Sequence, residues 1–254
     1  MLEVTGLTKT YGGVLAVKGL SFTARPGQVI GFLGPNGSGK TTSIRVLTGL
    51  LRATRGRVCW NSIDIQHDLL DYQGRLGYVP EEPHLYQYLT APEYLELVGG
   101  LRDLPRATVA RRIDRYLELF HLDTDRYAPL SSFSKGMRQK VLISAALLHD
   151  PDVVVLDEPC SGLDVASTLV LRTLVRSLAE RGKVIVYSSH VLDMVEKVCS
   201  EVLILHEGRV VAHDSVDRLR ELQHAASLEQ VFKQLAVEEN VEAVGRQIAE
   251  VALT

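Results

Sequence analysis

Nine residues close to the start of the chain have the types and spacing of a phosphate-binding loop. They read G-P-N-G-S-G-K-T-T and fit the pattern G-x-x-x-x-G-K-[ST]. Glycines let successive backbone N–H groups converge on one anion, and the N-terminus of a following helix adds to the same field. Lys40 supplies a point charge for the outer phosphates, and the Thr41 hydroxyl can ligate Mg²⁺. We therefore predict a phosphate site formed by Gly34, Pro35, Asn36, Gly37, Ser38, Gly39, Lys40, Thr41 and Thr42.

The flanks of this loop favour the strand and the helix that it needs on either side. Residues 28–33 (Q-V-I-G-F-L) form an apolar, β-favouring run, as expected of a buried parallel strand. Residues 42–51 place Ile44, Leu47 and Leu51 on one face of a helix. The alternative is a glycine-rich turn that imitates the motif, and the matching flanks argue against it.

A second apolar run ends in two adjacent carboxylates. Residues 153–156 (V-V-V-L) predict a strand that is covered on both faces, and Asp157 and Glu158 follow it. Asp157 can hold Mg²⁺ directly or through water, and Glu158 can orient and polarise an attacking water. The alternative is a strand that ends in a solvated acidic turn. The phosphate loop in the same chain favours the catalytic interpretation.

The segment L-S-S-F-S-K-G-M-R-Q-K, residues 130–140, is a second candidate anion site. Ser134 is a good helix N-cap, and the helix should continue to about Leu148 with an almost wholly apolar body. Its polar N-terminus, with a serine hydroxyl and the small Gly136, attracts anions. Taken alone, the segment favours the alternative of a plain N-cap.

Three single residues could join these sites. His190 stands just past a predicted buried strand, residues 183–189, and so emerges at the same sheet edge as Lys40, where it can contact phosphate. Glu81 lies in a proline-broken loop after a predicted strand, and solvated charge is its alternative. Tyr11 precedes two glycines at a strand end, where it is either a platform for a purine base or an ordinary turn tyrosine.

Length, composition and net charge exclude several classes of protein. The 254 residues are 46% hydrophobic, enough for one large domain or two small ones, and the net charge of −3 argues against a protein that coats nucleic acid. Three cysteines lie far apart without metal-binding spacing, which favours reduced cytosolic thiols. No signal-peptide layout and no run of about 20 apolar residues is visible. We expect a soluble protein that acts on a membrane process only through a partner.

The remaining pattern predicts the other elements. Residues 2–4 and 20–23 favour short strands, and residues 56–65 favour a hairpin that turns at Asn61 and Ser62. The block from residue 91 to about residue 150 favours a helical insertion, in which Arg111, Arg112 and Arg115 form the solvated face of one helix. Further predictions are a helix at 165–181, a hairpin at 202–212 and an amphipathic tail helix at 227–253.

Taken together, the motifs resemble the ATP-binding cassette (ABC) ATPase family over about residues 1–220. Tyr11 falls where that family stacks adenine, and residues 34–42 match its Walker A loop. F-S-K-G-M at 133–137 stands at the position of its signature, usually L-S-G-G-Q. Asp157 and Glu158 match its Walker B motif and general base, residues 161–164 its D-loop, and His190 its switch histidine.

The resemblance implies an α/β fold: a P-loop NTPase core with a mostly parallel sheet, an N-terminal antiparallel β subdomain and a helical subdomain at about 85–150, followed by a helical extension at 221–254. It implies ATP and Mg²⁺ as cofactors. Thr41, Asp157 and Glu81 would ligate the metal. Glu158, His190 and Lys40 would act in ATP hydrolysis.

The resemblance also implies the partners. Two ATPase subunits, identical or not, would form a head-to-tail dimer in which Ser134 and Gly136 of one chain close on the ATP of the other. The two subunits would act on a separate membrane permease at the inner face of the cell membrane. No nucleic acid is expected as a partner. Two alternatives remain open: a soluble ABC ATPase that acts on ribosomes or DNA, and a non-hydrolysing regulatory module. The first usually carries two cassettes or a long coiled-coil insertion, and Glu158 with His190 argues against the second.

The chain departs from the family pattern at three positions. Glu81 stands where the family usually has glutamine, so a third carboxylate would crowd Asp157 and Glu158. Lys135 and Met137 replace a glycine and a glutamine of the signature. The segments F-S-K-G-M-R-Q and S-S-H-V-L are most similar to ATPase subunits of bacterial ABC-2 type exporters, a group that includes antibiotic and multidrug exporters.

Overall fold

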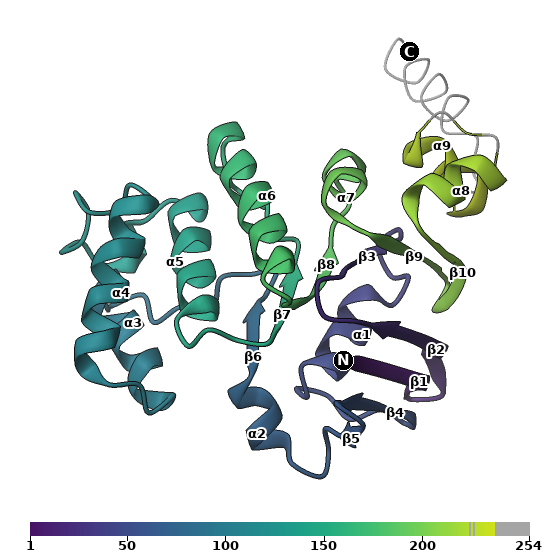
Figure 1. Ribbon diagram of the computed structural model, residues 1–254, viewed down its shortest axis with the longest axis horizontal. Helices are drawn as coiled ribbons and strands as arrows, with labels where there is room; N and C mark the ends of the chain where they lie inside the picture. Colours follow the sequence, from purple (N-terminus) through teal and green to yellow (C-terminus); the bar gives the residue numbers. More distant parts are fainter. Residues whose placement is uncertain (224, 226, 237–254) are drawn as a thin grey trace, which may run out of the picture.

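The computed structural model describes residues 1–223, 225 and 227–236, and shows an α/β chain with two sheets (Figure 1). The larger sheet has the strand order β10-β9-β3-β8-β7-β6. Its strands pair in parallel except for β10, which is antiparallel to β9 at one edge. The strands are β3 (Val29–Leu33), β6 (Leu76–Val79), β7 (Val153–Asp157), β8 (Val184–Ser188), β9 (Glu201–His206) and β10 (Arg209–Asp214).

The central strands β3, β7 and β8 are buried at every residue, as their continuous apolar sequences predict. Their side chains alternate between two cores. Val29 and Leu33 join a core with the helices that follow residue 90. Ile30 and Phe32 join the core beneath the smaller sheet. The sheet therefore has both faces covered, which leaves the strand ends as the places where polar side chains can gather.

The smaller sheet is antiparallel, with the order β2-β1-β4-β5. Its strands are β1 (Leu2–Tyr11), β2 (Val14–Ala24), β4 (Arg55–Trp60) and β5 (Ile63–Asp64). The first two are much longer than the short strands expected, because they pair with each other along most of their length. Asn61 and Ser62 form the predicted turn, with φ angles of 48° and 67°. The N-terminal antiparallel part of the predicted fold is confirmed.

The helical part lies to one side of the larger sheet (Figure 1). It consists of α3 (Ala91–Leu101), α4 (Arg106–Leu119), a 3₁₀ turn (Leu130–Ser132) and α5 (Lys135–Leu147). Thr90 and Glu93 form a reciprocal cap at the start of α3. The prediction that Arg112 belongs to a solvated face is wrong. Its guanidinium is partly buried and donates to the carbonyl of Leu148, so the side chain ties α4 to the end of α5.

The other helices cover the larger sheet or flank it. They are α1 (Lys40–Leu47), α2 (Leu69–Gly74), α6 (Val165–Glu180), α7 (Leu192–Val198), α8 (Val216–Leu222) and α9 (Leu228–Ala236). The sequence did not predict α2, α7 or α8, since each has only six or seven residues and shows no full helical period. The predicted tail helix is α9 as far as Ala236, and residues 237–253 lie outside the described part of the chain.

Helix α7 packs very closely against β3. A Cβ atom at Gly31 would lie 2.8 Å from Cys199 Sγ and 3.0 Å from Val195 Cγ1, so only glycine fits at this position of the strand. Cys199 directly follows α7 and is the residue that ends it. The end of α7 that is distant from His190 is therefore held against the middle of the sheet.

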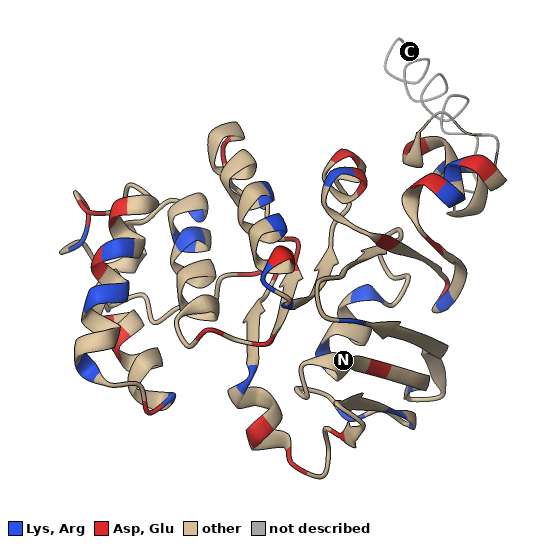
Figure 2. Cartoon of the chain, viewed as in Figure 1, with Lys and Arg blue, Asp and Glu red and all other residues tan. Residues whose placement is uncertain are grey.

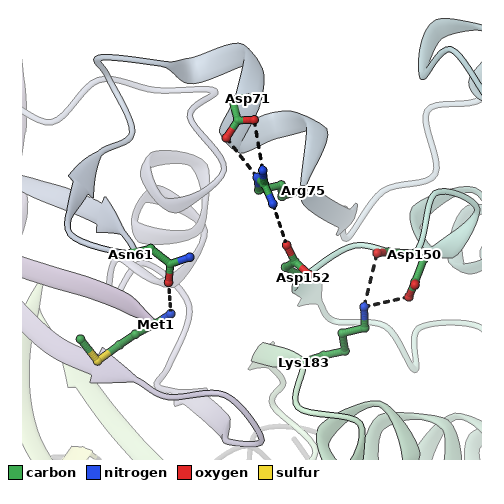
Figure 3. A network of polar contacts seen from close by, with 7 residues as sticks. All are labelled: Met1, Asn61, Asp71, Arg75, Asp150, Asp152 and Lys183. Carbon is green, nitrogen blue, oxygen red and sulfur yellow. Dashed lines mark hydrogen bonds and ion pairs between the residues drawn. The ribbon is translucent and has the colours of Figure 1, made fainter.

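Ion pairs hold the edge of the larger sheet at which its parallel strands begin (Figure 3). Arg75, just before β6, contacts Asp71 at 3.0 Å and Asp152 at 3.3 Å. Lys183, just before β8, contacts Asp150 at 2.8 Å. These pairs are partly solvated and individually weak, but they align the starts of three neighbouring strands. Figure 2 shows that acidic and basic residues lie mostly on the helices and loops, where both signs are mixed, whereas the strands of the larger sheet are largely uncharged.

Candidate functional site

The loop between β3 and α1 has the backbone of an anion cradle. Gly37 and Gly39 have φ angles of 79° and 100°, a left-handed region that favours glycine. A Cβ atom at Gly39 would lie 2.5 Å from the carbonyl oxygen of Ala16, and one at Gly34 would lie 2.4 Å from that of Leu205. No side chain caps the N-terminus of α1. Its first N–H groups therefore remain available to an anion at the helix end.

A cavity of about 520 Å³ opens over this cradle. All of the predicted phosphate-loop residues line it except Ser38, which is buried. The structure brings four further predicted residues to the same cavity from the ends of three other strands, β6, β7 and β8: Glu81, Asp157, Glu158 and His190. Because β3, β7 and β8 run in parallel, their carboxyl ends meet at one edge, and this is what assembles the site.

Lys40 begins α1 and folds its side chain over the loop. Its Nζ donates to the carbonyl oxygens of Gly34 at 2.6 Å and Pro35 at 3.0 Å. Burial lowers the pKa of Lys40, while the nearby carboxylates of Glu158, Asp157 and Glu81 act in the opposite direction. The ammonium is thus a charge fixed in the cradle, placed to meet a phosphate oxygen.

Asp157 is the last residue of β7 and is only 1% exposed. Its Oδ2 atom is buried without a hydrogen-bond partner. Burial raises the pKa of Asp157 to about 6, and the charges of Glu81 and Glu158 act in the same direction. An unpaired buried carboxylate oxygen among other carboxylates calls for a cation.

The donor set fits Mg²⁺ when phosphate is present. Thr41 and Glu81 line the cavity together with Asp157 and provide hard oxygen atoms. Within the described residues, no three His, Cys, Asp or Glu side chains are arranged to hold a metal ion by themselves. Phosphate oxygens and water would complete the coordination, which is the usual arrangement for Mg²⁺.

Glu158 is held in a strained position directly beyond Asp157. Its φ angle is 48°, in the left-handed region, and its N–H donates to the carbonyl of Ser188 at 3.0 Å. Its Oε2 atom lies 2.8 Å from Nδ1 of His190 and accepts a hydrogen bond from Ser189 Oγ at 3.4 Å. The carboxylate is buried, whereas the histidine ring is mostly exposed. The pair therefore lies at the cavity wall with one buried and one exposed partner.

The structure leaves three predicted site residues outside this cavity. Ser134 caps α5 by accepting a hydrogen bond from the Met137 N–H at 3.2 Å, as predicted, but neither Ser134 nor Gly136 lines the cavity of its own chain. Tyr11 ends β1, is 46% exposed, and carries the Lys9 ammonium 5.2 Å from its ring centroid. Stacking of a base on Tyr11 stays a prediction.

The start of α5 is joined to the loop that follows Glu158. Lys135 Nζ donates to Ser161 Oγ at 2.5 Å, and a Cβ atom at Gly162 would lie 2.9 Å from Lys135 Cγ. A Cβ atom at Gly136 would lie 2.4 Å from the carbonyl oxygen of Gly162. The two glycines let the two segments approach this closely. Lys135 thus spans both segments, a role that its type and position alone did not indicate.

Sequence reasoning missed the apolar part of the cavity wall. Ala16, Leu192 and Phe232 line it, and they come from β2, α7 and α9. Only Phe232 had a signal, as a member of the apolar face of the tail helix. That periodicity predicts that the helix face is buried but does not predict which part of the protein it packs against.

Fold and site together define a P-loop nucleotide-binding protein with an antiparallel β subdomain and a helical insertion. The family model for ABC transporters matches residues 17–161. The chain is 35% identical to the ABC transporter ATP-binding protein NatA of Bacillus subtilis (strain 168) over 220 residues, which cover 86% of this chain and 89% of NatA. It is 37% identical to the Nod factor export ATP-binding protein I of Ralstonia nicotianae over 212 residues, 84% of this chain and 66% of that protein.

A solved structure described as the ATP-binding subunit of an ABC transporter superimposes with a TM-score of 0.87 at 32% identity, and covers 92% of this chain and 99% of the other. The chain spans 62% of the length of another curated relative. The chain belongs to the ABC transporter family and is similar to its ATP-binding subunits. None of the helices that the structure describes has the length and apolar character to cross a bilayer.

Proposed function

We propose that this chain is the ATP-hydrolysing cassette of an exporter and works as a pair of cassettes on a separate membrane permease. One observation carries the proposal: the predicted second anion site, at the start of α5, lies outside the cavity of its own chain. An exposed helix N-terminus with a serine hydroxyl attracts a phosphate. A second cassette that supplies the phosphate would give this end its ligand.

The residues around the cavity divide the chemistry of hydrolysis among them. The loop N–H groups and Lys40 bind the phosphates and stabilise negative charge on them. Mg²⁺, held by Thr41, Asp157 and Glu81 with phosphate oxygens, would neutralise charge on the outer phosphates. Glu158 takes the role of general base, because it is the buried carboxylate beyond the metal-binding aspartate.

In this proposal His190 would take two positions in turn. Its Nδ1 contacts Glu158 at 2.8 Å, and its ring, 74% exposed, is free to turn toward a phosphate. In the first position it holds the carboxylate in place. In the second it would contact the outer phosphate while Glu158 faces the attacking water. We therefore assign His190 to positioning of the base and contact with phosphate.

Two cassettes would pair head to tail with two-fold symmetry, so that each nucleotide meets Lys40 of one chain and Ser134 and Gly136 of the other. ATP then joins the two chains and hydrolysis loosens them, which can drive a permease between two states. The export function of the Nod factor relative supports the direction of transport. The motif resemblance to ABC-2 type exporters supports it as well. In this assignment the chain works at the inner face of the cell membrane.

Mixing two inactive variants tests the shared site. A Lys40→Ala chain and a Ser134→Tyr chain should each lose ATPase activity, because every site in either homodimer is defective. Their mixture should recover activity, since one site of the mixed dimer combines an intact loop with an intact α5 end. The matched control mixes Lys40→Ala with Glu158→Gln, where both defects affect the loop side and no intact site can form. Absence of recovery in the first mixture, with both chains folded by circular dichroism, would reject the pairing.

A further inference from the structure

One wall of the nucleotide cavity comes from the C-terminal part of the chain. Phe232, on α9, lines the same cavity as the phosphate loop and the Glu158–His190 pair. It lies beyond residues 17–161, which the family model matches, and beyond the sequence motifs described above. A segment with no motif of its own therefore reaches the site where nucleotide binds.

The position of Phe232 is fixed by the packing of α9. Leu228 and Val231 on the same helix are fully buried, and α9 contacts α7, α8, β9 and β10. Figure 1 shows α9 beside α8, at the side of the sheet that β9 and β10 form. Phe232 follows Leu228 by four residues and so shares its helix face. Its partly buried ring packs against the core and also borders the cavity.

The second apolar residue of this wall connects Phe232 to the reacting groups. Leu192, the first residue of α7, is two residues after His190 and lines the cavity too. Helices α7 and α9 contact each other. Phe232 and Leu192 therefore both add apolar surface to the wall of the cavity that Glu158 and His190 also line. Such a surface keeps water away from that side of the cavity and strengthens charge interactions inside it.

We propose that α9 is part of the nucleotide-binding site, that Phe232 is a positioning residue which closes the cavity beside His190, and that nucleotide binding and the docking of α9 stabilise each other. By linkage, the factor by which docked α9 tightens nucleotide binding equals the factor by which nucleotide favours docking. This proposal depends on nucleotide binding, which is a property of the family. It does not depend on the proposed pairing of two cassettes.

Titration of the full-length chain with ADP tests the coupling without hydrolysis. Phe232→Ala should weaken ADP binding roughly 5- to 20-fold, because the ADP-bound protein loses the burial of one apolar side chain. The matched control is Leu235→Ala on the same helix, whose partly buried side chain packs against the core and does not line the cavity. Leu235→Ala should change ADP binding less than twofold. Equal affinities for all three proteins, or equal losses in both variants, would overturn the proposal.

Hydrogen exchange provides a readout that separates positioning from general packing. ADP should slow exchange at the amides of residues 228–236 in the wild-type chain, and this protection should shrink in Phe232→Ala. Unchanged exchange in this segment at saturating ADP would contradict the coupling. If the mixture of Lys40→Ala and Ser134→Tyr recovered ATPase activity while Phe232→Ala bound ADP normally, the role of α9 would be rejected. The proposed function as an exporter cassette would then still hold.

Discussion

Nδ1 of His190 lies 2.8 Å from Oε2 of Glu158, so the exposed histidine and the buried carboxylate form a pair at the wall of the nucleotide cavity. The two residues follow neighbouring parallel strands, β8 and β7, and the register Asp157↔Ser188 sets their separation. The pair joins the group that we propose as the general base to the group that we propose as a phosphate contact. In the proposed mechanism, His190 would leave this contact when it meets a phosphate.

Replacement of Glu158 by glutamine should separate binding from turnover. Glu158→Gln keeps the shape of the side chain but removes the base, so we expect ATP hydrolysis to fall roughly 10²- to 10⁴-fold with ATP affinity retained. ATP should then hold the variant as a dimer, which sedimentation can detect. Glu180→Gln, at an exposed position on α6, is the control and should hydrolyse ATP normally. A normal rate in Glu158→Gln would show that another group activates the water.

Lys40→Ala should abolish tight nucleotide binding. The variant loses both the charge for phosphate and the two hydrogen bonds that Nζ makes to the loop carbonyls at 2.6 Å and 3.0 Å. Lys40→Arg keeps the charge but not the compact ammonium, and we expect intermediate binding. Isothermal titration with ATP and ADP measures both variants. Undiminished affinity in Lys40→Ala would contradict the geometry of the cradle.

The contact between Lys135 and Ser161 should appear as an energetic coupling. Lys135→Met keeps the apolar stem that packs against Gly162 and removes the donor, and Ser161→Ala removes the acceptor. Because the two groups bond to each other at an exposed site, we expect a coupling free energy of about 0.5–1 kcal/mol in a double-mutant cycle of urea unfolding. Strictly additive effects would show that the two segments are held together by other contacts.

His149 should make stability fall at acid pH. Its ring is partly buried at the end of α5, its Nε2 lies 3.0 Å from the carbonyl oxygen of Leu76, and burial together with the charges of Arg102 and Arg112 lowers its pKa to about 4. The unfolded chain binds a proton near pH 6.5, so stability is complete above that pH and is lost as pH falls toward 4. The loss is at most about 3 kcal/mol, and less because the ring is partly exposed.

Urea unfolding at pH 7 and pH 4.5 measures this effect. His149→Gln retains a donor for the Leu76 carbonyl but does not titrate, so the variant should lose less stability between the two pH values than the wild-type chain does. Carboxylates elsewhere titrate equally in both proteins and cancel in the difference. Identical pH dependence would show that His149 is not protonated on unfolding in this range.

The phosphate loop and the acidic pair after β7 could be predicted from sequence because their chemistry depends on local spacing. The strands that flank them were predicted as well, since full burial demands continuous apolar runs. The lengths of β1 and β2 could not be predicted, because they depend on pairing with each other. Arg112 was assigned wrongly, because its partner Leu148 lies 36 residues away in the sequence. Phe232 reaches the cavity through tertiary packing of α9, which no local pattern encodes.

The tight fit between Gly31 and Cys199 fixes one end of α7 relative to β3. Cys199 pins the far end of α7 to the middle strand of the sheet, while His190 lies just before the other end. Helix α9 contacts α7, so the two helices that supply Leu192 and Phe232 to the cavity wall are positioned in part by how α7 packs on β3. A methyl group at residue 31 would lie 2.8 Å from Cys199 Sγ, so we expect Gly31→Ala to displace α7 from β3 although residue 31 does not line the nucleotide cavity.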